Sequence, residues 1–383
     1  MPSTKIAVPC SGDCPIRGEL EVLYSKIDEN ALDPIISEII STSIRNFPTF
    51  KTKKERNLAF SALFDFCVNL RYISGLKKGD LFKSGIVCED KVVFPFIKMC
   101  PICSAKKKQV VFLEKGSNKP ESATIGKIGE ATLAKILDQY FQYTGTKFRA
   151  FLIKDTAEKK VDLILTDSKV VCVGEIKAKP LVSYPLYLQV NHLKGTQHEL
   201  VDVKVEDVTN TNLLIPHIEK TLQLGKPTEK DWPFSGALKL VQNKENVATI
   251  ISAWNKIFQE YSKDTGGKTT WVRFLAFGGG AYNGQNIDDS KNRPGLDRTD
   301  DIKKGTYQVI RYGANYSAKC KESQVKSVLV GNIYAETHRD YFDDILGVKW
   351  TLDGKKYFNL FDAIIGLTDN KFNDEYLKEK MDK

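Results

Sequence analysis

The spacing of apolar residues predicts helices in the first part of the chain. Isoleucines at positions 35, 36, 39 and 40 repeat with the 3.6-residue period of a helix that buries one face. The same period predicts three helices, over Ile16–Ile27, Asn30–Phe47 and Lys53–Leu76. A short β-rich piece, Gly85–Leu113, follows them. The start of the chain is therefore expected to be mainly helical.

The polar stretch Glu114–Glu121 contains Gly, Ser, Asn and Pro together and predicts a linker. Behind it the pattern predicts one helix, three strands and, after a long middle region, a strand, a helix and a final strand. These elements cover Ile125–Tyr143, Lys147–Lys154, Val161–Leu165, Val170–Lys177, Trp271–Phe277, Thr299–Tyr316 and Ser327–Ala335. We expect two domains, residues 1–118 and 119–383, in a mixed α/β fold with helices packed on a central sheet.

Composition narrows the class of protein only slightly. The 383 residues include 57 Lys and Arg against 48 Asp and Glu, a net charge of +9, and hydrophobic residues make up 42%. This is a globular profile, without an apolar run long enough to cross a membrane. The N-terminus lacks the apolar core of a signal peptide, so a soluble, cytoplasmic protein is expected. The positive charge favours nucleic acid as a partner, but only weakly.

Cysteine pairs predict a metal site. Cys10 and Cys14 form one close pair, and Cys100 and Cys103 form another, in Cys-Pro-Ile-Cys, which resembles a zinc knuckle. We predict a structural zinc site from these four thiols, with Cys88 as a substitute ligand; buried thiols that only pack are the alternative. The remaining cysteines lie in apolar patterns, and the four histidines show no metal-binding spacing.

The hairpin of the second half groups charged residues on one face. With Thr166–Lys169 as the turn, Leu165 faces Val170, and Asp162 falls on the same side of the sheet as Glu175 and Lys177. Two carboxylates and an ammonium between apolar strands are costly unless they have a function. The alternative is an ion pair between Glu175 and Lys177 on an exposed strand.

Val161-Asp162, twelve intervening residues and Glu175-Ile176-Lys177 resemble the signature of the PD-(D/E)xK nucleases, with Val161 in place of the proline. The predicted order of one helix, three strands, a helix and a strand is also similar to the core of that family. The resemblance extends from Ile125 to Ala335, with residues 181–298 as a large insertion. It adds Glu130 as a further acidic residue of the site, on the buried stripe of the first helix.

The resemblance implies a type II restriction endonuclease that cuts double-stranded DNA with Mg²⁺. Asp162, Glu175, Glu130 and the carbonyl of Ile176 would hold the metal, and Lys177 would orient or deprotonate the attacking water. The family further implies a homodimer and a cognate DNA methyltransferase in a restriction-modification system. Two alternatives stay open: a repair, recombination or transposon nuclease with the same core, and a non-catalytic, zinc-containing DNA-binding protein.

Residues for DNA contacts are suggested by a basic run and by a polar loop. They are Lys106 and Lys107 after the cysteine knuckle, and Asn283, Gln285, Arg293 and Arg298. The alternatives are a solvated charged face for the lysines and ordinary turn formation for the loop.

Overall fold

The structure is a computed structural model in which the chain divides into two compact units. It describes residues 8–9, 14–114, 118–154, 161–218, 220–263, 272, 281–283, 286–288, 293–320, 324–351, 354 and 357–382. Unit 1 comprises Met1–Asp33, Gly129–Ala178 and Gly295–Lys383, and unit 2 comprises Pro34–Ile128 and Lys179–Pro294. Each unit is therefore built from separate stretches of the chain.

Unit 1 is organised around a six-stranded mixed sheet in the order β17-β16-β13-β6-β5-β4. The strands are β4 (Arg149–Leu152), β5 (Leu163–Thr166), β6 (Val171–Lys177), β13 (Val325–Gly331), β16 (Ala363–Gly366) and β17 (Asn370–Phe372). β13 runs parallel to both β6 and β16, whereas the outer pairs are antiparallel. Parallel strands are usually buried on both faces, which fits the uninterrupted burial of β6 up to Ile176.

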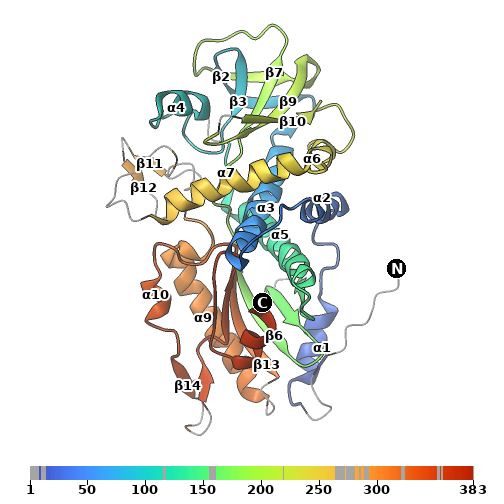
Figure 1. The fold of residues 1–383 in the computed structure, drawn as a ribbon, viewed down its shortest axis with the longest axis vertical. Helices are drawn as coiled ribbons and strands as arrows, with labels where there is room; N and C mark the ends of the chain where they lie inside the picture. Colours follow the sequence, from blue (N-terminus) through green and yellow to red (C-terminus); the bar gives the residue numbers. More distant parts are fainter. Residues whose placement is uncertain are drawn as a thin grey trace. The chain divides into compact units, whose positions relative to one another are not determined.

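Helices cover the unit 1 sheet. They are α1 (Arg17–Ser25), most of α5 (Ser122–Tyr143), α9 (Thr299–Asn315), α10 (Asp340–Asp343) and α11 (Glu375–Met381). Figure 1 shows α9 running alongside β6 and β13, which it contacts. Tyr312 of α9 and Leu20 of α1 pack with Val173 of β6 in one apolar cluster. Short strands β14 (Lys349–Thr351) and β15 (Tyr357–Asn359) form a separate hairpin.

Unit 2 contains an antiparallel sheet in the order β1-β2-β3-β7-β9-β10, with β8 paired to β2 (Figure 1). The strands are β1 (Lys77–Lys78), β2 (Leu81–Cys88), β3 (Lys91–Phe94), β7 (Leu186–Val190), β8 (Leu200–Lys204), β9 (Val208–Ile215) and β10 (Lys220–Gly225). Its helices include α2 (Pro34–Arg45), α3 (Lys53–Ser74), α4 (Pro101–Lys107), α6 (Phe234–Val241) and α7 (Lys244–Ser262). β11 (Ala281–Asn283) and β12 (Asn286–Asp288) form a small hairpin.

Two buried polar residues of α3 fix the segment that follows β6 in the chain. The backbone N–H groups of Leu181 and Val182 donate to Asp65 Oδ2 at 3.0 and 2.7 Å, and the Trp254 indole of α7 donates to the same oxygen. Asn69, one helical turn further on, receives the N–H of Tyr184 and donates to the carbonyl of Val182. Buried side chains thus satisfy the backbone of an extended segment that has no strand partner there.

The predicted helices and most predicted strands are present, and the fold is mixed α/β as expected. The division into units differs from the predicted boundary at 118/119, because β7 and β8 of the expected insertion pair with β3 and β2 of the expected N-terminal domain. The predicted strand Trp271–Phe277 lies outside the described residues except for Val272. No helix in the described part of the chain is both long and apolar enough to cross a membrane.

Candidate functional site

The β5–β6 hairpin pairs two residues away from the predicted register. Thr166 faces Val171 and Leu165 faces Cys172, so the turn is Asp167–Val170. The observed register differs from the predicted one because the Asp167 carboxylate accepts the N–H groups of Lys169 and Val170, at 2.7 and 2.9 Å. These bonds close the turn after Thr166. A shift of two residues preserves which side chains share a face. The predicted grouping of Asp162 with Glu175 therefore survives the corrected register.

Asp162 and Glu175 lie together at the start of β5 and the end of β6. The N–H of Ile176 donates to Asp162 Oδ2 at 3.0 Å, which holds the Asp162 carboxylate against the strand that carries Glu175. Both residues are buried, with exposed fractions of 9% and 8%. Two carboxylates are thus fixed side by side with little access to water.

Glu175 is bonded through both of its carboxylate oxygens. Lys177 Nζ lies 2.5 Å from Glu175 Oε1, and the hydroxyl of Tyr312 donates to Glu175 Oε2 at 2.7 Å. Lys177 Nζ also lies 3.4 Å from the carbonyl oxygen of Ile176. The ammonium therefore stands among the oxygens that the sequence predicts as metal ligands, and the Tyr312 hydroxyl fixes the carboxylate from α9. Tyr312 carries no motif in the sequence and was not predicted.

The charges of this cluster perturb one another. Burial raises the pKa of Glu175, the neighbouring charge of Asp162 raises it further, and Lys177 and Tyr312 oppose this rise. Burial lowers the pKa of Lys177, but the charges of Glu175, Asp162 and Asp301 outweigh burial, and the net pKa is raised. Lys177 therefore stays protonated, and the two carboxylates favour a cation between them.

The first residues of α5 in unit 1 approach the end of β6 closely. A Cβ atom on Gly129 would lie 2.3 Å from the carbonyl oxygen of Ala178, the residue after Lys177, so only glycine fits at this position. Glu130 is the next residue and is half-buried. The place of its carboxylate beside Asp162 and Glu175, and its role in metal binding, stay predictions.

A second cluster, in unit 2, brings together Cys88, Cys100, Cys103 and His198, whose ligand atoms all lie within 4.8 Å of one another. Cys88 Sγ lies 3.5 Å from Cys100 Sγ and 3.6 Å from Cys103 Sγ, and Cys103 Sγ lies 3.3 Å from His198 Nε2. Around a zinc ion with Zn–S bonds of about 2.3 Å, tetrahedral sulfur ligands lie about 3.7 Å apart. The four groups could therefore hold a metal ion such as zinc.

The local fold explains why these four groups meet. Cys88 ends β2, and Cys100 is the N-cap of α4, where its sulfur accepts the N–H of Cys103. His198 is held beside β2 because its N–H donates to the carbonyl of Val87 at 2.8 Å. Gln197 donates to the sulfurs of Cys88 and Cys103. A hydrogen bond from the Cys100 thiol lowers the pKa of Cys88 to about 6, so the cluster favours a thiolate.

Of the four predicted zinc ligands, Cys100 and Cys103 lie in this cluster. Cys14 Sγ lies 3.6 Å from Cys320 Sγ and packs on the apolar cluster of unit 1, whereas Cys100 and Cys103 belong to unit 2. Cys10 lies outside the described residues. Cys88, predicted as a substitute ligand, lies in the cluster. His198 lies there as well, although sequence spacing indicated no ligand, because the pairing of β8 with β2 brings it there.

The residues predicted to contact DNA come from both units. Lys106 forms an ion pair with Glu89 at 2.5 Å, and Lys107 is exposed at the end of α4. Arg298 precedes α9 in unit 1 and pairs with Asp300 and Asp301, at 3.3 and 3.6 Å. Arg293 is half-buried, Asn283 ends β11, and Gln285 lies outside the described residues. Lys106, Lys107, Asn283 and Arg293 belong to unit 2, so the set forms no single cluster within one unit.

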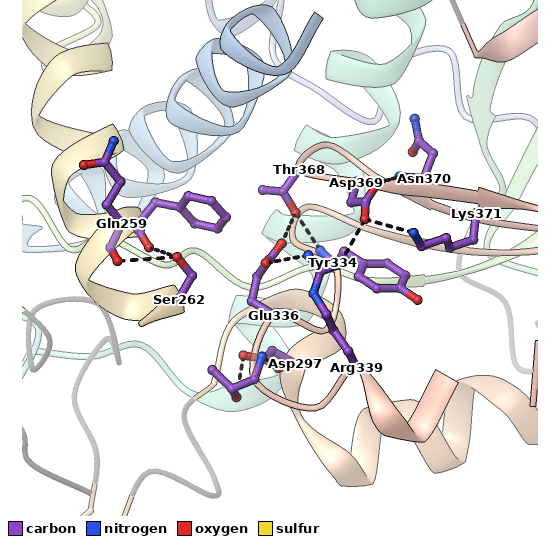
Figure 2. Close-up of polar contacts among 12 residues, drawn as sticks. Gln259, Ser262, Asp297, Tyr334, Glu336, Arg339, Thr368, Asp369, Asn370 and Lys371 are labelled. Atoms are coloured by element: carbon purple, nitrogen blue, oxygen red, sulfur yellow. Dashed lines mark hydrogen bonds and ion pairs between the residues drawn. The ribbon is translucent and has the colours of Figure 1, made fainter. Parts of the chain in front are cut away.

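A polar network unforeseen from the sequence follows β13 and β16 (Figure 2). Glu336 Oε2 accepts from Arg339 at 2.9 Å, Glu336 Oε1 accepts from Thr368 at 3.0 Å, and Asp369 pairs with Arg339 and Lys371, each at 3.3 Å. Gly331 of β13 is in register with Lys177 of β6 and with Gly366 of β16. Apart from Lys371 of β17, the network therefore belongs to segments that follow β13 and β16, at the same end of the sheet as Glu175 and Lys177.

Comparison of the chain with models of protein families, with curated proteins and with solved structures found no match. Any functional assignment must therefore come from the residues and their geometry.

Proposed function

We propose that the protein is a Mg²⁺-dependent endonuclease of the PD-(D/E)xK type that hydrolyses double-stranded DNA. The observation that carries the proposal is the cluster of Asp162, Glu175 and Lys177, which lies where β6 ends in the unit 1 sheet. Support comes from the chain order of α5, β4, β5, β6, α9 and β13, with β4–β6 antiparallel and β13 parallel to β6. This order is similar to that of the family core.

The donor set fits a hard divalent cation. Carboxylates of Asp162 and Glu175 and the Ile176 carbonyl are oxygen ligands of the kind Mg²⁺ prefers, and Lys177 already brings one positive charge to two of these groups. A bound Mg²⁺ would neutralise charge that develops on the phosphate. Lys177 would then contact the phosphate or the attacking water, and Tyr312 would keep the Glu175 carboxylate turned toward the metal.

A restriction enzyme is the form of nuclease we favour, acting as a homodimer on a two-fold symmetric site beside a cognate DNA methyltransferase. This part of the proposal rests on the resemblance and on the net charge of +9.

The test is digestion of a supercoiled plasmid with Mg²⁺ by the wild type and by Asp162→Asn, Glu175→Gln and Lys177→Met. Glu29→Gln is the matched control, because Glu29 is an exposed carboxylate of unit 1. We expect discrete fragments from the wild type and the control, and a loss of roughly a thousandfold or more in the three variants. Cleavage that survives in all three variants would refute the site. Nicking that depends on branched or damaged DNA would instead indicate a repair or recombination nuclease.

We also propose that the cluster of Cys88, Cys100, Cys103 and His198 holds structural zinc. Three thiols and one imidazole are the soft donors that zinc prefers, and four protein ligands leave no open coordination position for a reacting group. Zinc here would fasten α4 and the His198 loop to β2.

A further inference from the structure

A cavity of about 260 Å³ lies in unit 2, between α4 and the strands that it faces. The helix and the sheet both line the cavity. The helix contributes Pro101, Ile102, Ala105 and Lys106, and the sheet contributes residues of β3, β7, β9 and β10. All of its lining residues belong to unit 2. The cavity does not include any residue of the Asp162 cluster, so it needs its own explanation.

The lining combines an apolar floor with an aromatic wall and a charged rim. Ile102, Leu214 and Ile215 supply the apolar surface, and Ile215 is fully buried. Tyr187 of β7 supplies the aromatic wall, and the Lys91 ammonium lies 5.7 Å from its ring centroid. An apolar, aromatic interior with a few polar groups at its mouth is the usual character of a site for a small organic ligand.

The size of the cavity limits the ligand. Cavities for drug-sized molecules measure roughly 300–1,000 Å³. A cavity of about 260 Å³ is smaller and suits a single planar ring system. Such a ring would pack on the apolar floor and against Tyr187, because aromatic rings attract one another in offset-stacked or edge-to-face arrangements and an aromatic face attracts a nearby ammonium.

Charge at the mouth of the cavity favours a ligand attached to phosphates. The ion pair between Lys106 and Glu89 stands at the rim, and Lys107 and Lys108 follow it on the exposed end of α4. The rim segments 89–91 and 106–108 contain four lysines against two acids, a net charge of +2. Phosphates on either side of a bound ring would meet these lysines.

We propose that this cavity binds a nucleobase that has left the base stack, while Lys106 and Lys107 contact the flanking phosphates. The inference rests on the proposed DNA substrate and adds a second contact to it, distant in sequence from Asp162 and Glu175. A base that is already unpaired would bind best, because extruding a paired base costs unstacking and unpairing energy.

The test uses three fluorescein-labelled duplexes that differ at one position: fully paired, with one extra unpaired adenine, and with an abasic unit in place of that adenine. Binding is measured by fluorescence anisotropy without divalent ions, so that no cleavage occurs. We expect the wild type to bind the adenine duplex roughly tenfold more tightly than the abasic duplex. The abasic duplex keeps the phosphates and the bulge, so this difference isolates the base.

Two variants fill the cavity from opposite sides, Thr221→Trp on β10 and Ile102→Trp on α4. Both should bind the adenine and abasic duplexes equally. Thr209→Trp is the matched control, because Thr209 is an exposed residue of the neighbouring strand β9 outside the cavity, and it should keep the tenfold difference. Thermal unfolding followed by circular dichroism verifies that all three variants fold.

Equal affinity of the wild type for the adenine and abasic duplexes would overturn the inference, as would a preference that both filling variants retain. Plasmid cleavage judges the nuclease separately. A preference for the unpaired base without any cleavage would support the cavity as a base-binding site and reject the nuclease. Cleavage without such a preference would support the nuclease and reject the base-binding site.

Discussion

The Glu175 carboxylate is held by two elements, since its own strand β6 carries Lys177 and α9 carries Tyr312. A buried carboxylate needs such partners, because a charge removed from water is costly unless it is paired and hydrogen-bonded. The contact from Tyr312 is the one that no sequence motif indicated. It makes Tyr312 a positioning residue, acting on the reaction only through Glu175.

Tyr312→Phe removes the hydroxyl that donates to Glu175 Oε2 and leaves the ring in the apolar cluster. We expect the cleavage rate to fall roughly tenfold, since a hydrogen bond to a charged group contributes about 1.5–3 kcal/mol. The Tyr312 bond lowers the pKa of Glu175, so its loss should move the acid limb of the pH–rate profile to higher pH. Single-turnover plasmid cleavage across pH measures both effects.

Tyr307→Phe is the control for that experiment, because Tyr307 lies on the same helix and is 61% exposed. It should leave the rate and the pH profile unchanged. If Tyr312→Phe slows cleavage but leaves the pH–rate profile unshifted, Tyr312 acts through packing and not through its bond to Glu175.

Asp65 makes the stability of unit 2 depend on pH. Burial raises the pKa of Asp65 to about 8, against the hydrogen bonds from Val182, Trp254 and Leu181, which lower it. The folded protein therefore keeps a proton on Asp65 that the unfolded chain has already released above its ordinary pKa of 3.8. Protonation stabilises the fold at low pH, and this contribution is lost as pH rises toward 8.

Asp65→Asn should flatten this dependence between pH 5 and 8, because the amide carbonyl can accept the same three donors without a charge. In the wild type, deprotonation of Asp65 lowers the free energy of unfolding by at most about 1.4 kcal/mol per pH unit between pH 5 and 8. Urea unfolding followed by circular dichroism measures it, with the exposed Asp80→Asn of the same unit as control. Parallel pH curves for the wild type and Asp65→Asn would contradict the assignment.

Among the elements, hairpins and helices were predictable because their pairing is local. The predicted register of the β5–β6 hairpin differs from the observed one by two residues. The prediction of which side chains share a face is still correct, because side chains alternate with a period of two. The unit 2 sheet could not be predicted, because β3 finds its partner β7 about a hundred residues later. The same long-range pairing hid His198, which reaches Cys103 because its segment pairs with β2, as in the bond from the His198 N–H to the Val87 carbonyl.

Helix α4 is the element that the proposed zinc would stabilise most. It has seven residues, too few to be stable alone, and Cys100 and Cys103 attach it to β2 through the cluster. Purified wild-type protein should contain one zinc per chain by elemental analysis. Cys88→Ser and His198→Ala should each lower this content severalfold, because each removes a ligand.

Two matched variants test whether Cys88 and His198, rather than Cys14, are zinc ligands. His192→Ala changes an exposed histidine of the same β7–β8 connection, and Cys14→Ser changes the thiol that lies beside Cys320. Both should retain the full zinc content. Loss of zinc in Cys14→Ser together with retention in His198→Ala would restore the ligand set predicted from the sequence.

For the whole molecule, the chain passes between the units at 33/34, 128/129, 178/179 and 294/295. The linker-like stretch Glu114–Glu121 therefore lies within unit 2 and does not separate the two units. Composition locates polar segments, but a unit is defined by which strands pair, and β7 and β8 pair with β3 and β2 across that stretch.

Separate expression of residues 1–118 and 119–383 tests this interleaving. The second fragment lacks β2 and β3, which leaves β8 without its partner and one edge of β7 unpaired, and it also lacks α1, whose Leu20 packs on the unit 1 sheet. Unpaired apolar strands aggregate, so we expect neither fragment to give a soluble product with cooperative thermal unfolding by circular dichroism. Co-expression of both fragments is the control, because the same cut with every strand present should yield one soluble complex in gel filtration. A 119–383 fragment that unfolds cooperatively alone would mean that the unit 2 strands do not need β2 and β3.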